Sequence, residues 1–82
     1  MENQITIISP IPGVFYSKPS PDQPEFVVPG QEVKAGDVIG LVEIMKTFYE
    51  IKTEKDGVIE RIVVESEDVV DPGQEIAILT VK

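Results

Sequence analysis

Apolar residues occur along the chain in short runs that are rich in valine and isoleucine and are mostly bounded by glycine, proline, aspartate or asparagine. Such runs are typical of β-strands, because β-branched side chains fit a pleated, half-buried surface. Helical spacing of apolar positions is not sustained over a dozen residues, and the frequent prolines and glycines disfavour long helices. The predicted strands lie at residues 5–8, 13–16, 25–28, 38–43, 48–53, 58–64 and 76–81.

This pattern predicts an all-β fold of seven or eight short antiparallel strands in a sandwich or flattened barrel. The chain has 82 residues, enough for a single domain over residues 1–82. A domain of this size buries only about 60% of the surface of its unfolded chain, so it requires a compact, closed fold.

The chain also contains an internal repeat. Residues 33–42 can be aligned with residues 70–79 at a constant offset, and Gly13-Val14-Phe15 resembles Gly57-Val58-Ile59 at a somewhat larger one. Two halves of similar pattern predict pseudo-twofold symmetry, although any all-β protein with glycine turns shows such matches. The difference between the offsets indicates extra residues in the first half, around residues 17–23. That segment is polar and proline-rich, which predicts an exposed, stiffened, protruding loop.

A tight hairpin is predicted between strands 38–43 and 48–53, with Met45 and Lys46 at its tip. The turn lacks glycine, asparagine and aspartate, the usual residues of such turns, which suggests that the residues present serve another purpose. An exposed amine is protonated near neutral pH and becomes an acyl acceptor only when another enzyme deprotonates it. Position alone favours an ordinary surface lysine as the interpretation of Lys46.

Composition and charge exclude several functions. Fifteen acidic and seven basic residues give a net charge of −8, the opposite of a nucleic-acid-binding protein. The absence of cysteine and histidine removes disulfides, thiolate metal sites and the commonest general base, so an autonomous enzyme is disfavoured. Acidic residues at 65–71 lack the spacing of a calcium-binding loop, so no metal site is predicted. Without a signal peptide or an apolar stretch long enough to span a bilayer, we expect a cytoplasmic protein that binds neither membrane nor nucleic acid.

Glu43-Ile44-Met45-Lys46 resembles the Glu-Ala-Met-Lys-Met signature of biotinyl domains, in which the lysine is the attachment point. The resemblance extends over nearly the whole chain, to the biotin carboxyl carrier family of bacterial acetyl-CoA carboxylases. Its further matches lie at residues 9–16, 19–22, 28–33, 36–37, 55–57 and 64–65.

The resemblance implies a barrel-sandwich hybrid: a flattened barrel of two four-stranded antiparallel sheets with a pseudo-twofold axis and Lys46 on a hairpin tip. It implies a non-catalytic carrier whose Lys46 receives biotin from a biotin-protein ligase that reads Glu43 and Met45. A biotin carboxylase would then load a carboxyl group from bicarbonate with ATP, and a carboxyltransferase would pass it to an acyl-CoA. The resemblance also implies a protruding thumb, formed by Ser17, Lys18, Pro19, Ser20, Pro21 and Asp22.

Three residues depart from the family pattern. Ile44 replaces an alanine, Thr47 replaces the second methionine, and Lys18 replaces a threonine of the thumb. These differences leave open a carrier for another biotin-dependent carboxylase or decarboxylase. A lipoyl carrier is a further alternative, although methionine before Lys46 favours biotin. The last alternative is an unmodified β-module that binds other proteins, in which Lys46 is incidental.

Overall fold

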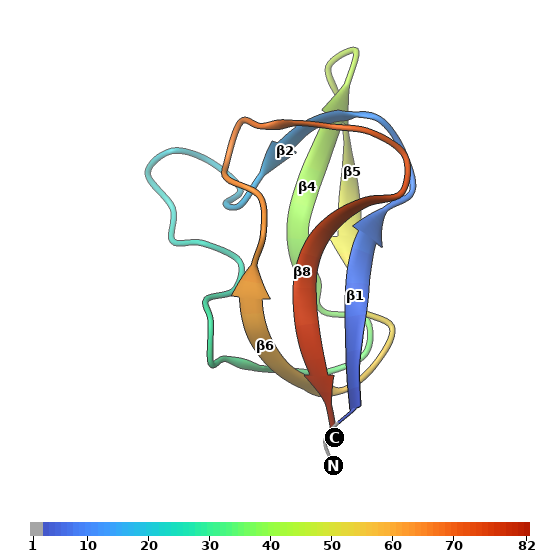
Figure 1. The fold of residues 1–82 in the computed structure, drawn as a ribbon. Helices are drawn as coiled ribbons and strands as arrows, with labels where there is room; N and C mark the ends of the chain where they lie inside the picture. The colour runs from blue at the N-terminus through green and yellow to red at the C-terminus, as the bar shows by residue number, and fades with distance from the viewer. Residues whose placement is uncertain (1–2) are drawn as a thin grey trace.

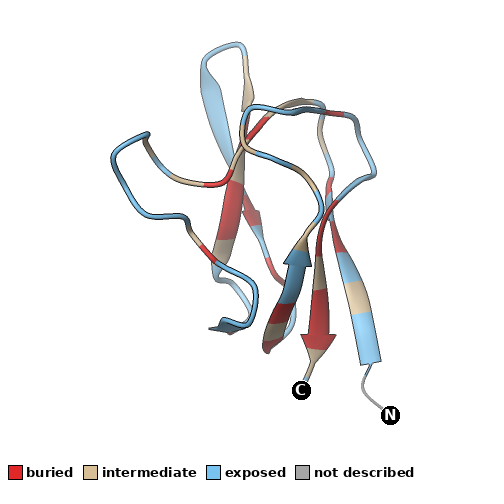
Figure 2. Cartoon of the chain, turned by 60° about the vertical axis from the view of Figure 1, so that its left-hand side comes forward, coloured by how far each residue is buried: buried red, intermediate tan, exposed pale blue. Residues whose placement is uncertain are grey.

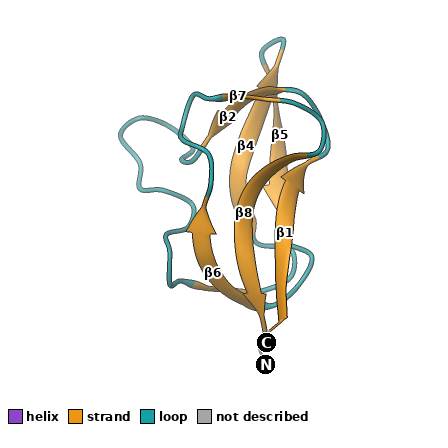
Figure 3. Cartoon of the chain, in the orientation of Figure 1, coloured by secondary structure: helices purple, strands orange, loops and turns teal. Residues whose placement is uncertain are grey.

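The computed structural model describes residues 3–82, so the first two residues of the predicted domain lie outside the described part of the chain. Eight strands and their connecting loops make up this part, which confirms the predicted all-β fold (Figures 1 and 3). Within residues 3–82, no helix is long and apolar enough to cross a membrane. The strands are β1 (Asn3–Ser9), β2 (Gly13–Tyr16), β3 (Glu32–Val33), β4 (Val38–Ile44), β5 (Thr47–Lys52), β6 (Gly57–Ile62), β7 (Val69–Val70) and β8 (Gln74–Val81).

The strands form two four-stranded antiparallel sheets with the orders β1-β8-β6-β3 and β5-β4-β2-β7. The two orders are related by a shift of four strands along the chain. β1, β8, β6 and β3 of the first sheet correspond in turn to β5, β4, β2 and β7 of the second. Each sheet therefore combines strands from both halves of the chain, and the halves are interlocked. This arrangement confirms the predicted pseudo-twofold symmetry.

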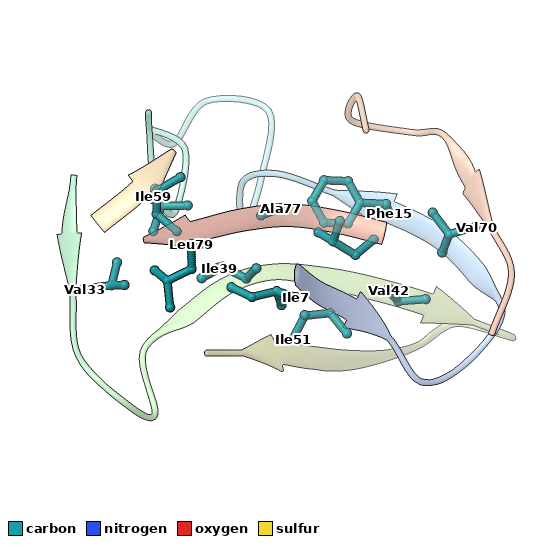
Figure 4. Packing of buried hydrophobic residues seen from close by; sticks show 12 residues of the cluster. Ile7, Phe15, Val33, Ile39, Val42, Ile51, Ile59, Val70, Ala77 and Leu79 are labelled. Atoms are coloured by element: carbon teal, nitrogen blue, oxygen red, sulfur yellow. The ribbon is translucent and has the colours of Figure 1, made fainter. Parts of the chain in front are cut away.

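The core lies between the two sheets (Figure 4), and ten of its twelve buried hydrophobic side chains form symmetry-related pairs. Each half contributes the same five inward positions, and every member is at most 7% exposed. Complete burial of one such aliphatic side chain stabilises the fold by about 1.5–3 kcal/mol. The pairs are Ile7 with Ile51, Phe15 with Ile59, Val33 with Val70, Ile39 with Ile76, and Val42 with Leu79.

Two of the four buried polar side chains, Ser9 and Thr53, follow the same symmetry. The Ser9 hydroxyl donates a hydrogen bond to the carbonyl oxygen of Ile11 at 2.6 Å, and the Thr53 hydroxyl donates to that of Lys55 at 2.9 Å. Each hydroxyl thus bonds to the residue two positions ahead, at the end of β1 in one case and of β5 in the other. The symmetry therefore extends to these two local polar contacts.

The glycine match detected in the sequence has a steric cause. A β-carbon at Gly13 would collide with the carbonyl oxygen of Glu43, and one at Gly57 would collide with that of Thr80. Only glycine permits this close approach of β2 to β4 and of β6 to β8.

One predicted strand, residues 25–28, is wrong. Prolines stand just before it and just after it, and its amides are tied to loop groups. The Phe26 amide donates to the carbonyl oxygen of Ser17 at 2.9 Å, and the Val28 amide donates to the Gln31 side chain at 3.2 Å. These bonds fix an irregular segment instead of a sheet ladder.

The prediction also missed two strands, β3 and β7. Each has two residues, which is too short to show an alternation of apolar and polar positions. The predicted strand 58–64 extended too far, because β6 ends at Ile62.

The symmetry of the core can be tested with paired substitutions. Ile39→Ala and Ile76→Ala each remove a fully buried side chain at equivalent positions. Each should lower the free energy of unfolding by about 2–5 kcal/mol, measured by urea denaturation. Val69→Ala is the control, since Val69 is 78% exposed and its truncation should cost no more than about 0.5 kcal/mol. A large loss from only one of the two isoleucines would contradict equivalent packing.

Candidate functional site

The hairpin between β4 and β5 projects from one end of the molecule (Figure 1). Ile44 pairs with Thr47, so Met45 and Lys46 alone form the turn, as predicted. Met45 is 92% exposed and Lys46 is also exposed, and the tip is drawn in the colour of exposed residues in Figure 2. The Lys46 amine can therefore be approached from outside the body of the protein.

The backbone of the turn is left-handed at both residues, with φ of 49° at Met45 and 66° at Lys46. A two-residue hairpin turn that matches the twist of its strands requires positive φ, which asparagine and glycine adopt easily. Residues with a larger side chain lose roughly 1–2 kcal/mol each in this conformation. The tip therefore retains Met45 and Lys46 at a cost in stability, as is common at functional sites.

A carboxylate lies in an apolar row on the outer face of the sheet, next to the tip. Glu43 on β4 pairs with Phe48 on β5 and with Val14 on β2, and Val14 pairs in turn with Val69 on β7. Directly paired residues share a face of the sheet, so these four side chains form one row. Phe48 is 54% exposed and Val69 is 78% exposed, so much of the row faces solvent.

Tyr16 on β2 connects to this row. Its hydroxyl donates a hydrogen bond of 3.1 Å to Glu43 Oε1, and its ring centroid lies 6.0 Å from that of Phe48 at an interplanar angle of 52°. The hydrogen bond to Glu43 raises the pKa of Tyr16 above its ordinary value, with smaller contributions from desolvation and from the charges of Glu43 and Glu67. Tyr16 is therefore a neutral donor to a charged acceptor across physiological pH.

The predicted protruding segment belongs to the longest loop of the chain in the described part. Residues 17–31 connect β2 to β3, whereas the symmetry-related connection from β6 to β7 uses only residues 63–68. The extra length therefore lies where the offset between the halves predicted it, and the loop stands away from the sheets in Figure 1.

Two local contacts shape this loop. Ser17 is buried at its base, where its amide donates to the Ser66 hydroxyl at 3.2 Å. The Ser20 hydroxyl donates to Asp22 Oδ1 at 2.7 Å, and this bond lowers the pKa of Asp22. The segment is thus anchored at its start and turned back on itself further out.

A groove of about 540 Å³ separates the loop from the outer face of the sheet. Four of the six predicted thumb residues line it, whereas Ser17, Asp22 and the motif residues 43–47 do not. The structure thus brings the thumb close to the aromatic pair beside the tip, but not into contact with the tip through this groove. Its lining residues are Tyr16, Lys18, Pro19, Ser20, Pro21, Leu41, Phe48, Ser66 and Glu67.

Sequence reasoning missed Tyr16 and Glu67 as residues of this region. The sequence does hint at Tyr16, because alternation along β2 turns Phe15 inward and Tyr16 outward. Glu67 has a φ of 75° at the position that matches Gly30, which has a φ of 89°. If the alignment of residues 33–42 with residues 70–79 is extended by three residues toward the N-terminus, Gly30 aligns with Glu67. The sequence therefore contains a signal that Glu67 stands where the backbone favours glycine.

Comparison with known proteins places this geometry in context. The chain matches the family described as biotin-requiring enzyme over residues 5–79. It is 42% identical over 72 residues to the biotin carboxyl carrier protein of acetyl-CoA carboxylase from Porphyra purpurea, covering 88% of this chain and 46% of that protein. The protein of the same name from Streptococcus pyogenes is 46% identical over 66 residues, covering 80% of this chain and 40% of that protein. The chain therefore spans less than half the length of these relatives.

Solved structures show the same fold. The urea carboxylase of Kluyveromyces lactis superposes with a TM-score of 0.79 at 25% identity, over 98% of this chain and 6% of that one. A single-chain, multi-domain long-chain acyl-CoA carboxylase superposes with a TM-score of 0.81 at 18% identity, over 96% of this chain and 7% of that one. This second similarity concerns the fold alone.

The strain at the tip can be measured by relieving it. Replacing Met45-Lys46 with Asn-Gly should raise the free energy of unfolding by about 2–4 kcal/mol, because both new residues adopt positive φ easily and each position is relieved of roughly 1–2 kcal/mol. Replacing the pair with Ala-Ala is the matched control, since it removes the same side chains without supplying left-handed residues. Urea denaturation that gives equal stability for the two variants would contradict strain in the turn.

The bond between Tyr16 and Glu43 predicts a pH dependence. In a Tyr49→Phe variant, Tyr16 is the remaining one of two tyrosines, so tyrosinate absorbance reports its titration directly. Its midpoint should lie above 10.0 and should fall toward 10.0 when Glu43→Ala is added. Because the folded-state pKa is raised, the stabilisation is complete below about pH 10 and is lost as pH rises through the raised value. Equal midpoints in the two variants would show that the bond is absent in solution.

Proposed function

Since the chain belongs to the biotin-requiring enzyme family, we propose that it is a biotin carboxyl carrier with biotin attached covalently to Lys46. The observation that carries this proposal is an exposed lysine in a strained two-residue turn at one end of a rigid β-fold. Residues 1–82 would act as one carrier domain that presents its cofactor to other proteins and catalyses no reaction itself.

The tip fits an attachment site in three respects. It is exposed, its backbone is fixed by the paired strands on both sides, and in the described residues Lys46 makes no ion pair. A biotin-protein ligase would remove a proton from the Lys46 ammonium, and the amine would attack the carbonyl carbon of activated biotin. The N–C bond forms as the bond to the activating group breaks, and the loss of one positive charge changes the net charge from −8 to −9.

The motif residues around Lys46 would have two roles: recognition by the ligase and closure of the hairpin. Glu43 and Met45 would be read by the ligase, since one is a carboxylate beside the tip and the other is an almost fully exposed apolar side chain. Ile44 and Thr47 form the last pair of the ladder and close the hairpin behind the lysine. Ile44 and Thr47 replace an alanine and a methionine of the family signature. They still form the closing pair of the hairpin, so this role does not require the signature residues.

Acetyl-CoA carboxylase is the complex we propose for this carrier, because the curated relatives quoted above are carriers of that enzyme. Biotin supplies a ureido nitrogen that accepts a carboxyl group at a biotin carboxylase and gives it up at a carboxyltransferase. The chain's own contribution would be to hold the attachment point clear of its body and to offer the outer sheet face and the thumb, residues 17–22, to these partners.

Intact-mass measurement tests the attachment. Protein coexpressed with a biotin-protein ligase should gain the mass of one biotinyl group, and Lys46→Arg should gain none while keeping the thermal stability of the wild type. Lys52→Arg is the control on the same hairpin, because Lys52 is exposed on β5, and it should be modified normally. A lipoyl adduct instead of biotin, an unmodified wild type, or modification of the Lys46→Arg variant would each overturn the proposed function.

A further inference from the structure

Glu43 occupies an unusual position for a carboxylate. It is half-buried in a row of apolar side chains, three residues before Lys46, on the outer face of the sheet. Among the described residues it takes part in no ion pair. Glu50, two positions beyond Phe48 on β5, differs in this respect because it pairs with Lys52 at 3.5 Å.

The group that holds Glu43 is neutral. The Tyr16 hydroxyl donates to Oε1, and the Tyr16 ring is supported by Phe48. A hydrogen bond to a charged acceptor is stronger than one between neutral groups, so it restricts the rotamers of the carboxylate. Unlike a lysine or an arginine, a phenol restricts the carboxylate without cancelling its charge.

The surroundings of Glu43 are therefore suited to binding a cationic side chain of another protein. Glu67 adds a second negative charge nearby, since it lines the same groove as Tyr16 and Phe48 and its charge contributes to the raised pKa of Tyr16. The exposed ring of Phe48 and the ring of Tyr16 offer aromatic surface, against which a guanidinium or ammonium group packs favourably. An acceptor that is already oriented loses less entropy when it binds such a group.

We propose that Tyr16 is a positioning residue that holds the Glu43 carboxylate toward a cationic side chain of the biotin-protein ligase. The inference rests on the proposed function, because it concerns the enzyme that modifies Lys46. It adds a residue outside the motif, on a different strand, to the recognition of the tip.

The experiment measures biotin transfer to the unmodified carrier by a purified biotin-protein ligase, as KM and kcat for the carrier. Tyr16→Phe keeps the ring and removes the hydroxyl, so KM should rise about three- to tenfold with kcat unchanged. Tyr49→Phe removes the other phenol and should leave both constants unchanged. Thermal unfolding of each variant verifies that the fold is kept.

A double-mutant cycle tests whether Tyr16 acts through Glu43. Glu43→Gln should raise KM at least as much as Tyr16→Phe, and adding Tyr16→Phe to it should change KM less than about twofold. The KM of the wild type should also rise with salt concentration, and this rise should be smaller in Glu43→Gln. In Glu50→Gln the rise should be as large as in the wild type, because the Glu50 charge is already paired with Lys52. The salt dependence should weaken in Tyr16→Phe as well, whereas a purely structural role for Tyr16 would leave it as in the wild type.

The outcomes separate the two proposals. If the wild type is biotinylated normally and Tyr16→Phe has the same KM, or if its effect is undiminished in the Glu43→Gln background, the positioning role is wrong and the carrier function stands. If the wild type accepts no biotin, the proposed function fails and the positioning role fails with it.

Discussion

The structure depends on a backbone constraint: only two residues connect two paired antiparallel strands, and both are left-handed. Ile44 and Thr47 are fixed opposite each other by the ladder between β4 and β5, so Met45 and Lys46 must complete the turn by themselves. The direction in which the lysine leaves the protein is therefore determined by the sheet. A flexible loop would expose an amine equally well, but it would not present that amine at a fixed place.

The interlocked core supplies the rigidity that this constraint needs. Each sheet contains strands from both halves, so β4 cannot shift without disturbing the inward side chains of both sheets. The pseudo-twofold symmetry relates β4 and β5 to β8 and β1. The place that corresponds to the hairpin tip is therefore where the end of β8 lies beside the beginning of β1. The two places lie at opposite ends of the molecule, so the hairpin tip that carries Lys46 faces away from both ends of the described chain (Figure 1).

The sequence predicted those features that depend on local pattern or on the repeat. The all-β fold follows from the short runs rich in valine and isoleucine, the hairpin tip from the short gap between two predicted strands, and the location of the extra loop from the offset between the halves. Residues 25–28 have the composition of a strand, but the backbone groups they require as partners are taken by loop contacts. Such competition between partners is a tertiary effect that composition does not reveal.

The contacts around the tip were beyond prediction for a similar reason. The bond between Tyr16 and Glu43 joins residues 27 positions apart and depends on the register of β2 against β4. A shift of one residue would turn Tyr16 into the core and leave Glu43 without its donor. The left-handed backbone of Glu67 was accessible in principle, through its match to Gly30, but only once the repeat was known to extend that far.

The central claim is that one amine, placed by a strained turn, is the acceptor for the cofactor. Proteolysis of the biotinylated chain followed by fragment-mass sequencing locates the modified residue directly. The account predicts that every biotinyl group is found on Lys46, with the lysines at 18, 34, 52, 55 and 82 unmodified. Biotin on any of these other lysines in the folded protein would contradict it.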